Sequence, residues 1–225
     1  LPHMIAQYHT LRARGCGVQL IIGPWTHGRP GALPWVVRES LGWLQAHLLG
    51  DDSQVRTSPV LVFQMGADRW LEYAEWPPPY RRERWHLQAD RGLSTAGPRA
   101  STPDHYRYDP RDPTPTVGGT SPMLGGGRAD QRPLEARPDV LTYTSAPLID
   151  ALDIVGPVSA DLFVRPSSPH TDLFARLCER CDSRSPVAHT RSIRATRGAA
   201  SRSARPPRSR QWTRACTTTP SILRP

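Results

Sequence analysis

The sequence has no lysine, so Arg supplies all 29 basic residues of its 225 positions. Together with 25 Pro, this indicates a GC-rich coding sequence. No apolar run approaches the roughly 20 residues that cross a bilayer, and no charged-then-apolar segment opens the chain, so we expect a cytoplasmic protein. The four cysteines are too few and too unevenly spread for a disulfide framework, which agrees with a reducing compartment.

The positive charge is concentrated at one end of the chain. Residues 1–175 carry 17 Arg and 18 acidic residues, a net charge of −1, whereas residues 176–225 carry 12 Arg and 2 acidic residues, a net charge of +10. A net charge of +9 spread over the whole chain would suggest a nucleic-acid binder. Because the first 175 residues are nearly neutral, the charge says little about what they bind.

The first 56 residues have the pattern of an α/β domain. Residues 2–14 predict a helix that ends at Gly15, and residues 18–22 form a short continuous apolar run typical of a strand buried on both faces. A second helix is predicted from Pro34 to Gly50. Its apolar stripe has helical spacing and consists of Val37, Leu41, Leu44 and Leu48.

From residue 57 the hydrophobic period becomes two. Strands are predicted at 60–65, 140–143, 158–164 and 173–177, with further alternation around Trp85–Ala89 and Tyr106–Tyr108. Proline- and glycine-rich connections separate them. Residues 57–177 therefore predict a mostly antiparallel β sandwich or jelly roll.

One histidine stands out by its position. His27 lies in the loop straight after the predicted buried strand, where α/β hydrolases place the last member of a Ser, Asp/Glu, His triad. A histidine in a surface loop is more often merely solvated, so position alone is a weak argument for catalysis.

Longer sequence motifs strengthen the argument that His27 is catalytic. The segment Leu20–Gly28 (LIIGPWTHG) resembles the catalytic-histidine segment of the cocaine-esterase/NonD-type serine hydrolases, relatives of Xaa-Pro dipeptidyl peptidases. Further words in the same order over residues 1–177 are similar to the helix that follows and to the family's β domain. These words are residues 43–50, 62–66 with Trp70 and 76–78, 108–119, 130–135, 137–143, 155–158 and 171–177.

The resemblance implies a C-terminal fragment of a two-domain serine hydrolase that cleaves ester or amide bonds through an acyl-enzyme. Residues 1–56 would be the end of the α/β catalytic domain, and residues 57–177 an incomplete jelly roll of the Xaa-Pro dipeptidyl-peptidase C-terminal type. Only His27 can be carried over, as general base. The sequence has no Gly-x-Ser-x-Gly, and its nearest look-alike, Gly92–Ala96, lies between predicted β-domain strands.

The implied partner is a small acyl ester, amide or peptide substrate, with no cofactor, no specific nucleic acid and no membrane; a homo-oligomer stays open. An alternative from another class is a non-catalytic β-sandwich module that binds a carbohydrate or a protein. An in-frame hydrolase half in the DNA upstream would separate the two.

Three other groups have competing explanations. Cys178 and Cys181, with His189 and Cys216, have the residue types of a zinc site, but a single C-x-x-C in a low-complexity segment favours coincidence. The carboxylates of Asp109, Asp112 and Asp130 could suggest calcium, yet neighbouring prolines favour turns. Trp70, Tyr73 and Trp76 could stack on a ligand, although packing of the second domain against the first is the simpler explanation. Cys16 shows no partner in the sequence.

The segment 178–225 is dominated by Arg, Ser, Thr, Ala and Pro and predicts disorder, because it has too little apolar surface to offset its ordering entropy. It could be a nucleic-acid-binding arm, an inert linker or a stretch translated out of frame. We favour the last, since the family words stop near Leu177 and the composition changes there.

Overall fold

The computed structural model describes residues 1–26, 30–119, 126–168, 170–181, 191–200, 213–218 and 221–223. The chain divides into two compact units. Unit 1 comprises Leu1–Pro78 and Gly118–Ala129, and unit 2 comprises Pro79–Val117 and Asp130–Pro225. None of the helices in the described residues has both the length and the apolar character needed to span a membrane.

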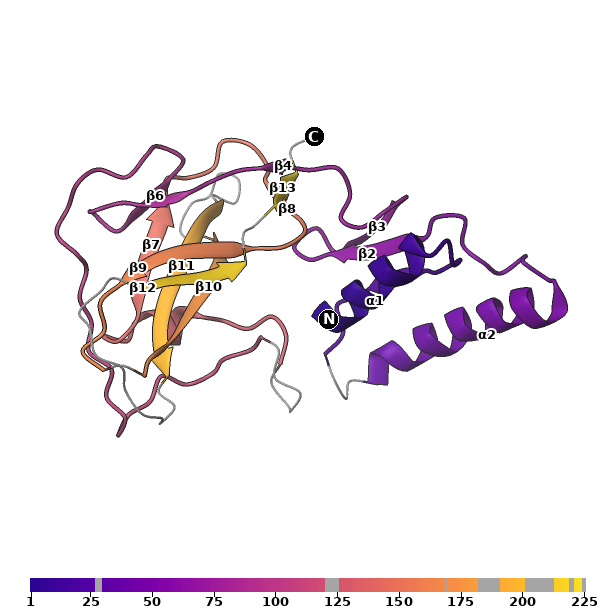
Figure 1. The fold of residues 1–225 in the computed structure, drawn as a ribbon, viewed down its shortest axis with the longest axis horizontal. Coiled ribbons are helices and arrows are strands. Elements are labelled where there is room, and N and C mark those ends of the chain that lie inside the picture. Colours follow the sequence, from indigo (N-terminus) through magenta and orange to yellow (C-terminus); the bar gives the residue numbers. More distant parts are fainter. Residues whose placement is uncertain are drawn as a thin grey trace. The chain divides into compact units, whose positions relative to one another are not determined.

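Unit 1 combines two long helices with a small mixed sheet (Figure 1). Its elements are α1 (Pro2–Ala13), β1 (Leu20–Ile22), the short 3-10 helix η1 (Pro30–Ala32), α2 (Leu33–Leu49), β2 (Val60–Gln64) and β3 (Arg69–Tyr73). The strand order is β1-β2-β3, with β1 and β2 parallel and β2 and β3 antiparallel. The succession β1–α2–β2 is therefore a βαβ unit, as the apolar strand and the amphipathic helix predict.

The helix ends and the core of unit 1 follow from its sequence. Gly50 ends α2 in the left-handed region at φ 74°, a conformation that costs glycine little. Tyr8 of α1, Leu20 of β1 and Val60 of β2 form a buried cluster against which Tyr73 and Trp76 pack. Val60 is fully buried, so the parallel strand pair lies at the centre of this core.

The expected boundary at residues 56 and 57 does not separate the two compact units. Backbone hydrogen bonds pair Leu20–Ile22 with Val60–Val62, and the second strand then pairs with β3. These bonds hold residues on both sides of position 56 in one sheet, so unit 1 extends to Pro78. Period-two alternation identified β2 as a strand but could not indicate which sheet it joins.

Unit 2 is mostly β, with a single short helix, α3 (Arg132–Glu135), among its described residues. Its five-stranded sheet has the order β10-β11-β7-β6-β5, and a two-stranded sheet β12-β9 crosses it in Figure 1. A three-stranded sheet has the order β4-β13-β8. The strands are β4 (Arg81–Arg82), β5 (His86–Leu87), β6 (Gly92–Ser94), β7 (Leu141–Ser145), β8 (Asp153–Ile154), β9 (Ser159–Val164), β10 (Asp172–Cys181), β11 (Arg191–Ala200), β12 (Thr213–Thr218) and β13 (Ser221–Leu223).

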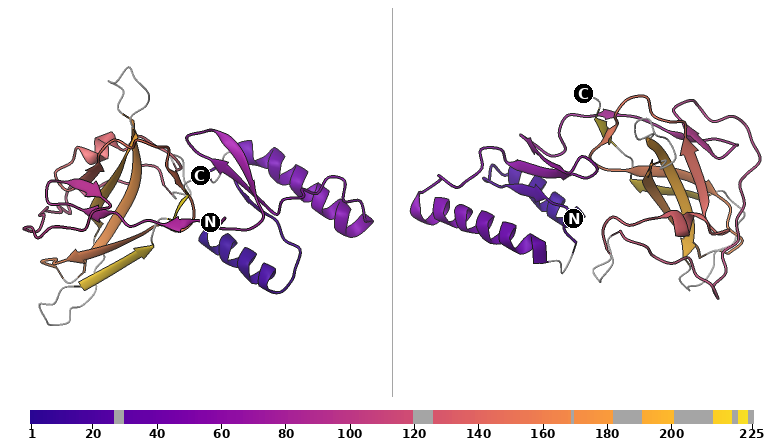
Figure 2. Two further views of the ribbon diagram at one scale, coloured as in Figure 1. Left: turned by 90° about the horizontal axis from the view of Figure 1, so that it is seen from above. Right: turned by 180° about the vertical axis from the view of Figure 1, so that it is seen from behind.

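This arrangement is consistent with a β sandwich (Figure 2). The strands expected near 140–143, 158–164 and 173–177 are present as β7, β9 and β10. The strand expected around Tyr106 and Tyr108 is absent from the described residues 101–109. Prolines on both sides remove backbone donors there, and Tyr106 packs against the core from irregular chain.

Disorder over all of residues 178–225 was the wrong prediction for four described stretches, which are residues 178–181, 191–200, 213–218 and 221–223. Arg191–Ala200 forms β11 and pairs along its whole length with Asp172–Cys181, and Arg194–Arg197 pairs with β7 on the other side. Thr213–Thr218 pairs with β9, and β13 lies between β4 and β8. Composition misled because it takes no account of neighbouring strands whose free backbone groups accept another strand.

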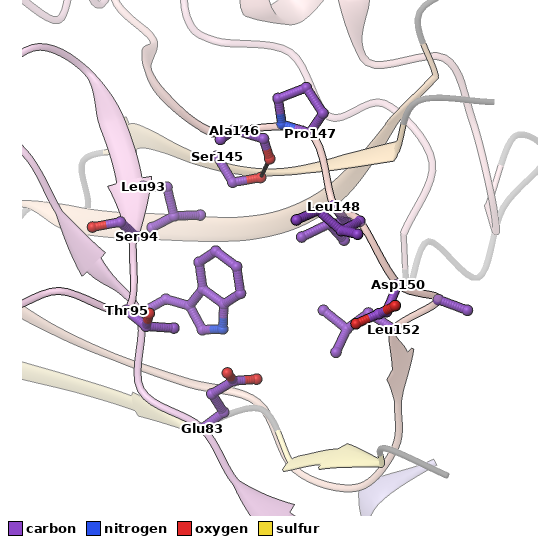
Figure 3. Close-up of a pocket in the computed structure, with 13 residues that line it drawn as sticks. Glu83, Leu93, Ser94, Thr95, Ser145, Ala146, Pro147, Leu148, Asp150 and Leu152 are labelled. Carbon is purple, nitrogen blue, oxygen red and sulfur yellow. Dashed lines mark hydrogen bonds between the residues drawn. The ribbon is translucent and has the colours of Figure 1, made fainter. Parts of the chain in front are cut away.

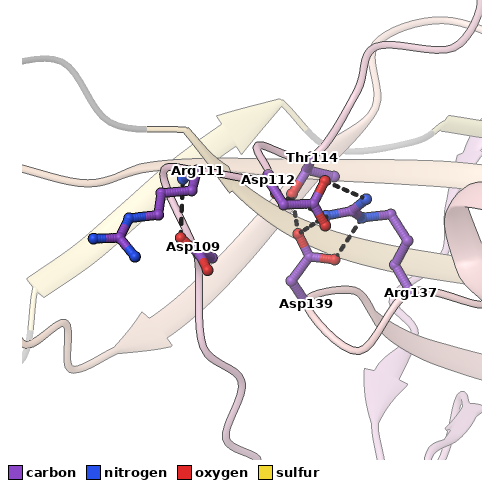
Figure 4. A network of polar contacts seen from close by, with 6 residues as sticks. All are labelled: Asp109, Arg111, Asp112, Thr114, Arg137 and Asp139. Carbon is purple, nitrogen blue, oxygen red and sulfur yellow. Dashed lines mark hydrogen bonds and ion pairs between the residues drawn. The ribbon is translucent and has the colours of Figure 1, made fainter.

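An ion-pair network in unit 2 links the buried carboxylate of Asp139 to Arg137, which also pairs with the exposed carboxylate of Asp112 (Figure 4). The Arg137 guanidinium donates to Asp139 Oδ1 at 2.8 Å and to Asp112 Oδ2 at 3.0 Å, and Thr114 Oγ1 donates to Asp139 Oδ2 at 2.5 Å. Asp139 is only 4% exposed. The hydrogen bond from Arg137 lowers the pKa of the Asp139 carboxyl below its usual range, burial opposes this change, and Thr114 adds to it.

We predict that Asp139→Asn lowers the free energy of unfolding by about 1.5–3 kcal/mol at neutral pH, since a hydrogen bond to a charged group is lost in a buried place. A carboxyl whose pKa is lower in the folded state stabilises above its unfolded value, near 3.8, and loses that contribution as the pH falls through the folded pKa. The deficit should therefore shrink below about pH 4. Urea unfolding of the wild type and the variant, at neutral pH and below about pH 4, measures this difference in the free energy of unfolding.

Asp130→Asn is the matched control, because Asp130 pairs with Arg132 on the surface, where the two side chains are 50% and 82% exposed. It should change stability little. Equal losses in the two variants would contradict the assigned role of the Arg137 network.

Candidate functional site

The predicted catalytic residue, His27, lies outside the described residues, which stop at Thr26 and resume at Pro30. The structure therefore describes the two ends of its loop. The loop leaves the carboxyl end of β1, a strand in parallel pairing with β2, and leads through η1 into α2. The carboxyl ends of parallel strands are where α/β proteins place ligand-binding and catalytic groups.

Trp25 is held against the start of this loop. Its indole folds back over Gly23, where a Cβ would lie 2.1 Å from Cζ3 of the ring, so a side chain at position 23 would displace the indole. Only glycine leaves this space. The presence of glycine in the Gly23-Pro24-Trp25 motif thus has a local steric reason.

Four aromatic rings form a group that we call the aromatic cluster, in which Trp70 contacts the other three: Trp25, Trp35, Phe63 and Trp70. Ring centroids lie 5.7 Å apart for Trp25 and Trp35, 5.6 Å for Trp25 and Trp70, and 4.6 Å for Trp35 and Trp70. Phe63 meets Trp70 edge-on at 5.2 Å. Because Trp25 precedes and Trp35 follows residues 27–29, the cluster fixes both flanks of the loop.

A distant segment also reaches the loop within unit 1. Gly127 has φ 90°, and a Cβ there would lie 2.6 Å from Cγ2 of Thr26. Gly119 and Gly127 bond each other through both backbone groups at 2.8 Å. Gly127 therefore lies against Thr26, the residue before His27, a contact that no local sequence signal indicates.

A polar clamp ties α2 to the chain on either side of it. Arg56 donates to Glu39 Oε2 at 2.9 Å and to Gln19 Oε1 at 3.0 Å. Gln19 Nε2 donates to the Arg56 carbonyl at 2.9 Å. Burial raises the pKa of the Glu39 carboxyl, but hydrogen bonds from Arg56 and Arg38 outweigh it, and the pKa lies below its usual range.

Trp70, Tyr73 and Trp76 have packing roles, but all three lie in unit 1 and contact residues of that same unit. Trp70 contacts Trp25 and Trp35, whereas Tyr73 and Trp76 pack on the cluster formed by Tyr8, Leu20 and Val60. All three side chains join residues beyond position 57 to residues before it.

The apolar stripe of α2 is exposed rather than buried. Val37 is 47% exposed, Leu41 55%, Leu44 49% and Leu48 74%. Leu33, Val36 and Leu49 are exposed as well. A continuous apolar helix face of this kind is typical of a surface that another part of a protein covers.

The remaining candidates have structural roles. Ser94, in the nearest look-alike of a nucleophile motif, lies in strand β6 and its Oγ accepts a hydrogen bond from Gln88, so it is on no strand-to-helix turn. Of the carboxylates expected to serve turns, Asp109 accepts from Arg111 N at 2.9 Å and Asp130 accepts from Arg132 N at 3.0 Å. Asp112 instead pairs with the distant Arg137.

For the cysteines, the described residues offer no set of three or more His, Cys, Asp or Glu that could hold a metal. Cys178 and Cys181 both lie in β10, Cys216 lies in β12, and His189 lies outside the described residues. Cys16 is exposed.

Comparison with known proteins gives a family match over most of the chain. Residues 53–210 match the X-Pro dipeptidyl-peptidase C-terminal non-catalytic domain. The match begins close to the expected boundary at residue 57 and extends beyond Leu177, where the likeness was expected to stop.

Among individual relatives, the cocaine esterase of Rhodococcus sp. (strain MB1 Bresler) is 34% identical over 188 residues, which are 72% of this chain and 33% of that protein. The chain thus spans about a third of this relative's length. An α-amino acid ester hydrolase structure has a TM-score of 0.72 at 21% identity, covering 97% of this chain and 42% of the other. An aminopeptidase from a marine sediment Thaumarchaeota archaeon has a TM-score of 0.62 at 22% identity, covering 91% and 38%. The two structures show similarity of fold.

We predict that Trp70→Ala disrupts the aromatic cluster and lowers the stability of unit 1 by about 3 kcal/mol, because Trp70 contacts all three other rings and only the contact between Trp25 and Trp35 remains without it. Near-ultraviolet circular dichroism should lose the signal of the coupled indoles. Trp43→Ala is the control, since Trp43 stacks only on His47 among the described ring pairs, with centroids 4.1 Å apart. If both variants lost the same signal, the cluster would not be the coupled unit described.

Proposed function

This chain belongs to the X-Pro dipeptidyl-peptidase C-terminal domain family, and on that premise we propose that it is part of a serine hydrolase that cleaves ester or amide bonds. The family resemblance inferred from sequence words is confirmed by the match over residues 53–210. In this proposal residues 1–56 form the end of an α/β-hydrolase catalytic domain, and the β unit that follows is a jelly roll of the dipeptidyl-peptidase type.

The observation that carries the proposal is the βαβ unit β1–α2–β2. A buried parallel strand leads at its carboxyl end into a loop whose flanks are fixed by the aromatic cluster, and His27 follows the last described residue of the first flank. This is the position that the histidine of a hydrolase triad needs, because it must reach a nucleophile at the same edge of the sheet.

The proposed chemistry assigns His27 two proton transfers. As general base it takes the proton of the nucleophilic serine hydroxyl while the serine oxygen attacks the acyl carbon. It then gives that proton to the departing alkoxide or amine, and a water molecule activated in the same way hydrolyses the acyl-enzyme. The serine and the carboxylate that orients the histidine are expected on the remainder of the catalytic domain, and the reaction requires no cofactor.

The exposed stripe of α2 supports this assignment. A strand at the edge of a mixed sheet and an unpartnered apolar helix face both need further α/β structure to cover them. The rest of a hydrolase domain supplies parallel strands for the free edge of β1 and apolar side chains for Val37, Leu41 and Leu44. The named activity of the cocaine esterase, at 34% identity, agrees with ester substrates.

A second candidate is a non-catalytic binding module. Its support is the matched domain itself, which is described as non-catalytic and covers residues 53–210, without the loop of His27. In that case the β unit would act through a ligand site of its own. DNA upstream that encodes no hydrolase half in frame would favour this second candidate.

We predict that His27→Ala, in the hydrolase that contains this chain, lowers turnover of an activated ester by about 10⁴-fold or more, since a triad works as a unit. His47→Ala is the control: His47 is exposed on α2 and stacks on Trp43, so turnover should stay near that of the wild type. Single-turnover kinetics with a chromogenic ester measures both. Near-normal turnover in His27→Ala would remove this residue from the mechanism.

We also predict that the 225-residue chain by itself hydrolyses no ester and takes up no serine-reactive phosphonate, because its sequence contains no Gly-x-Ser-x-Gly. Intact-mass spectrometry after incubation with a fluorophosphonate decides this. Stoichiometric labelling would mean that a serine of this chain is an activated nucleophile, contrary to the proposed division of the triad.

A further inference from the structure

A segment distant in sequence meets the flank of the loop that carries His27. Residues 118–129 belong to unit 1, although the residues on both sides of them, Val117 and Asp130, belong to unit 2. Within this segment, Gly127 lies so close to Thr26 that a Cβ at position 127 would stand 2.6 Å from Thr26 Cγ2. The contact gives the segment a direct hold on the residue that precedes His27.

The backbone around Gly127 is itself fixed. Gly119 and Gly127 donate their N–H groups to each other's carbonyl oxygens at 2.8 Å. Both have a positive φ, 75° and 90°, which glycine adopts at little cost. The two chains also approach closely at Gly118, where a Cβ would lie 2.5 Å from the Gly127 carbonyl oxygen. Gly127 can therefore move away from Thr26 only by breaking the bonds of this bridge.

The residues that flank the segment are tied together within unit 2. Arg176 of β10 donates to the Val117 carbonyl at 3.0 Å and to the side-chain oxygen of Gln131. Gln131 Nε2 donates to the same Val117 carbonyl at 3.1 Å. The segment is thus held at its base by these bonds and further along by the bridge between the two glycines. Such support from surrounding residues is what a precisely placed functional group requires.

Thr26 passes this constraint on to the next residue. Threonine is β-branched and has one stiff side-chain torsion, so the position of Cγ2 follows the backbone of Thr26 closely. The peptide bond to His27 is planar, so the backbone of Thr26 sets the direction in which the chain enters the catalytic residue. A general base must lie within hydrogen-bond reach of its partner, and a displacement of about 1 Å can cost about 10²-fold in rate.

We propose that Gly127 is a positioning residue for His27, which acts by holding Thr26 in place. The inference rests on the proposed function of His27 as general base. Glycine is required at position 127 for two reasons, the positive φ and the absence of a side chain beside Thr26 Cγ2.

Gly127→Ala, in the hydrolase that contains this chain, should lower kcat on an activated ester by about 10²-fold and leave KM within about twofold. Gly119→Ala is the matched control. Its φ of 75° lies in the same left-handed region and it keeps both hydrogen bonds of the bridge, but no described atom lies within 4 Å of a Cβ there. It shares the backbone strain without the clash, so kcat should stay within about threefold of the wild type.

Thr26→Ser tests the contact from the other side, because it removes Cγ2 and keeps the hydroxyl. Alone it loosens the contact and should lower kcat about fivefold at unchanged KM. Combined with Gly127→Ala it leaves room for the new methyl group, so kcat should recover to within about tenfold of the wild type, a non-additive result. If Gly127→Ala fails to fold, Thr26→Ser still decides, since an unchanged kcat there would contradict the proposal.

A second measurement needs no hydrolysis and uses the 225-residue chain. Its eight histidines and seven tryptophans give separate ¹⁵N NMR signals, and His27→Gln and Trp85→Phe assign two of them. The His27 imidazole signals should move in Gly127→Ala and stay in place in Gly119→Ala.

The Trp85 indole signal is the reference and should not move in either variant. Trp85 belongs to unit 2, where it lines a hollow of about 360 Å³ together with Leu93 and Leu148 (Figure 3). None of the described residues of 118–129 lines this hollow.

Four results would overturn the proposal. Equal losses of kcat in Gly119→Ala and Gly127→Ala would assign the effect to backbone strain. A raised KM at unchanged kcat would mean that the segment shapes substrate binding and does not position His27. The remaining two are a double variant no faster than Gly127→Ala and His27 signals that stay in place.

His27→Ala in the same assay separates this inference from the proposed function. Near-normal turnover in His27→Ala would remove the general base and, with it, the need for a positioning residue. Loss of turnover in His27→Ala with near-normal kcat in Gly127→Ala would leave the proposed function intact and remove only the role of Gly127.

Discussion

The parallel pairing of Leu20–Ile22 with Val60–Val62 is the contact on which unit 1 depends. It places Leu20 beside Val60 in the core, brings Trp70 of the next strand against Trp25, and sets the direction in which the loop of His27 leaves the sheet. Parallel strands need a crossover, and α2 provides it.

Much of this arrangement could be predicted from the sequence. The continuous apolar run before Gly23, the glycines that end the two helices and the helical stripe from Val37 to Leu48 each have a local cause. They indicated β1, α1 and α2 with bounds that the structure shifts by a few residues at most. The position of His27 after β1 could also be predicted from the local sequence. Its catalytic role became a hypothesis only through the resemblance to the family's motifs.

The failures share one physical origin, which is that strand partners are non-local. The expected boundary at residue 56 lies close to the start of the family match at residue 53 but does not divide the two compact units, because alternation identifies Val60–Gln64 as a strand without naming its neighbour. Disorder was expected for Arg191–Ala200 because its composition is poor in apolar residues, yet its backbone completes hydrogen bonds to β10 and β7. Edge strands offer those bonds to any chain that can extend beside them, almost regardless of side chain.

The sequence by itself determined the helices, most of the strands and the family to which the chain belongs. Hydrophobic periodicity, the glycines and prolines that end helices and strands, and the family motifs are each encoded within a short stretch of residues. Only the tertiary structure decided that Trp25, Trp35 and Trp70 form one cluster, that Gly127 reaches Thr26, and that the stripe of α2 is exposed. It also revealed the hollow beside Trp85, whose lining comes from segments about 50 residues apart. These are contacts between residues distant in the chain, and no local pattern specifies them.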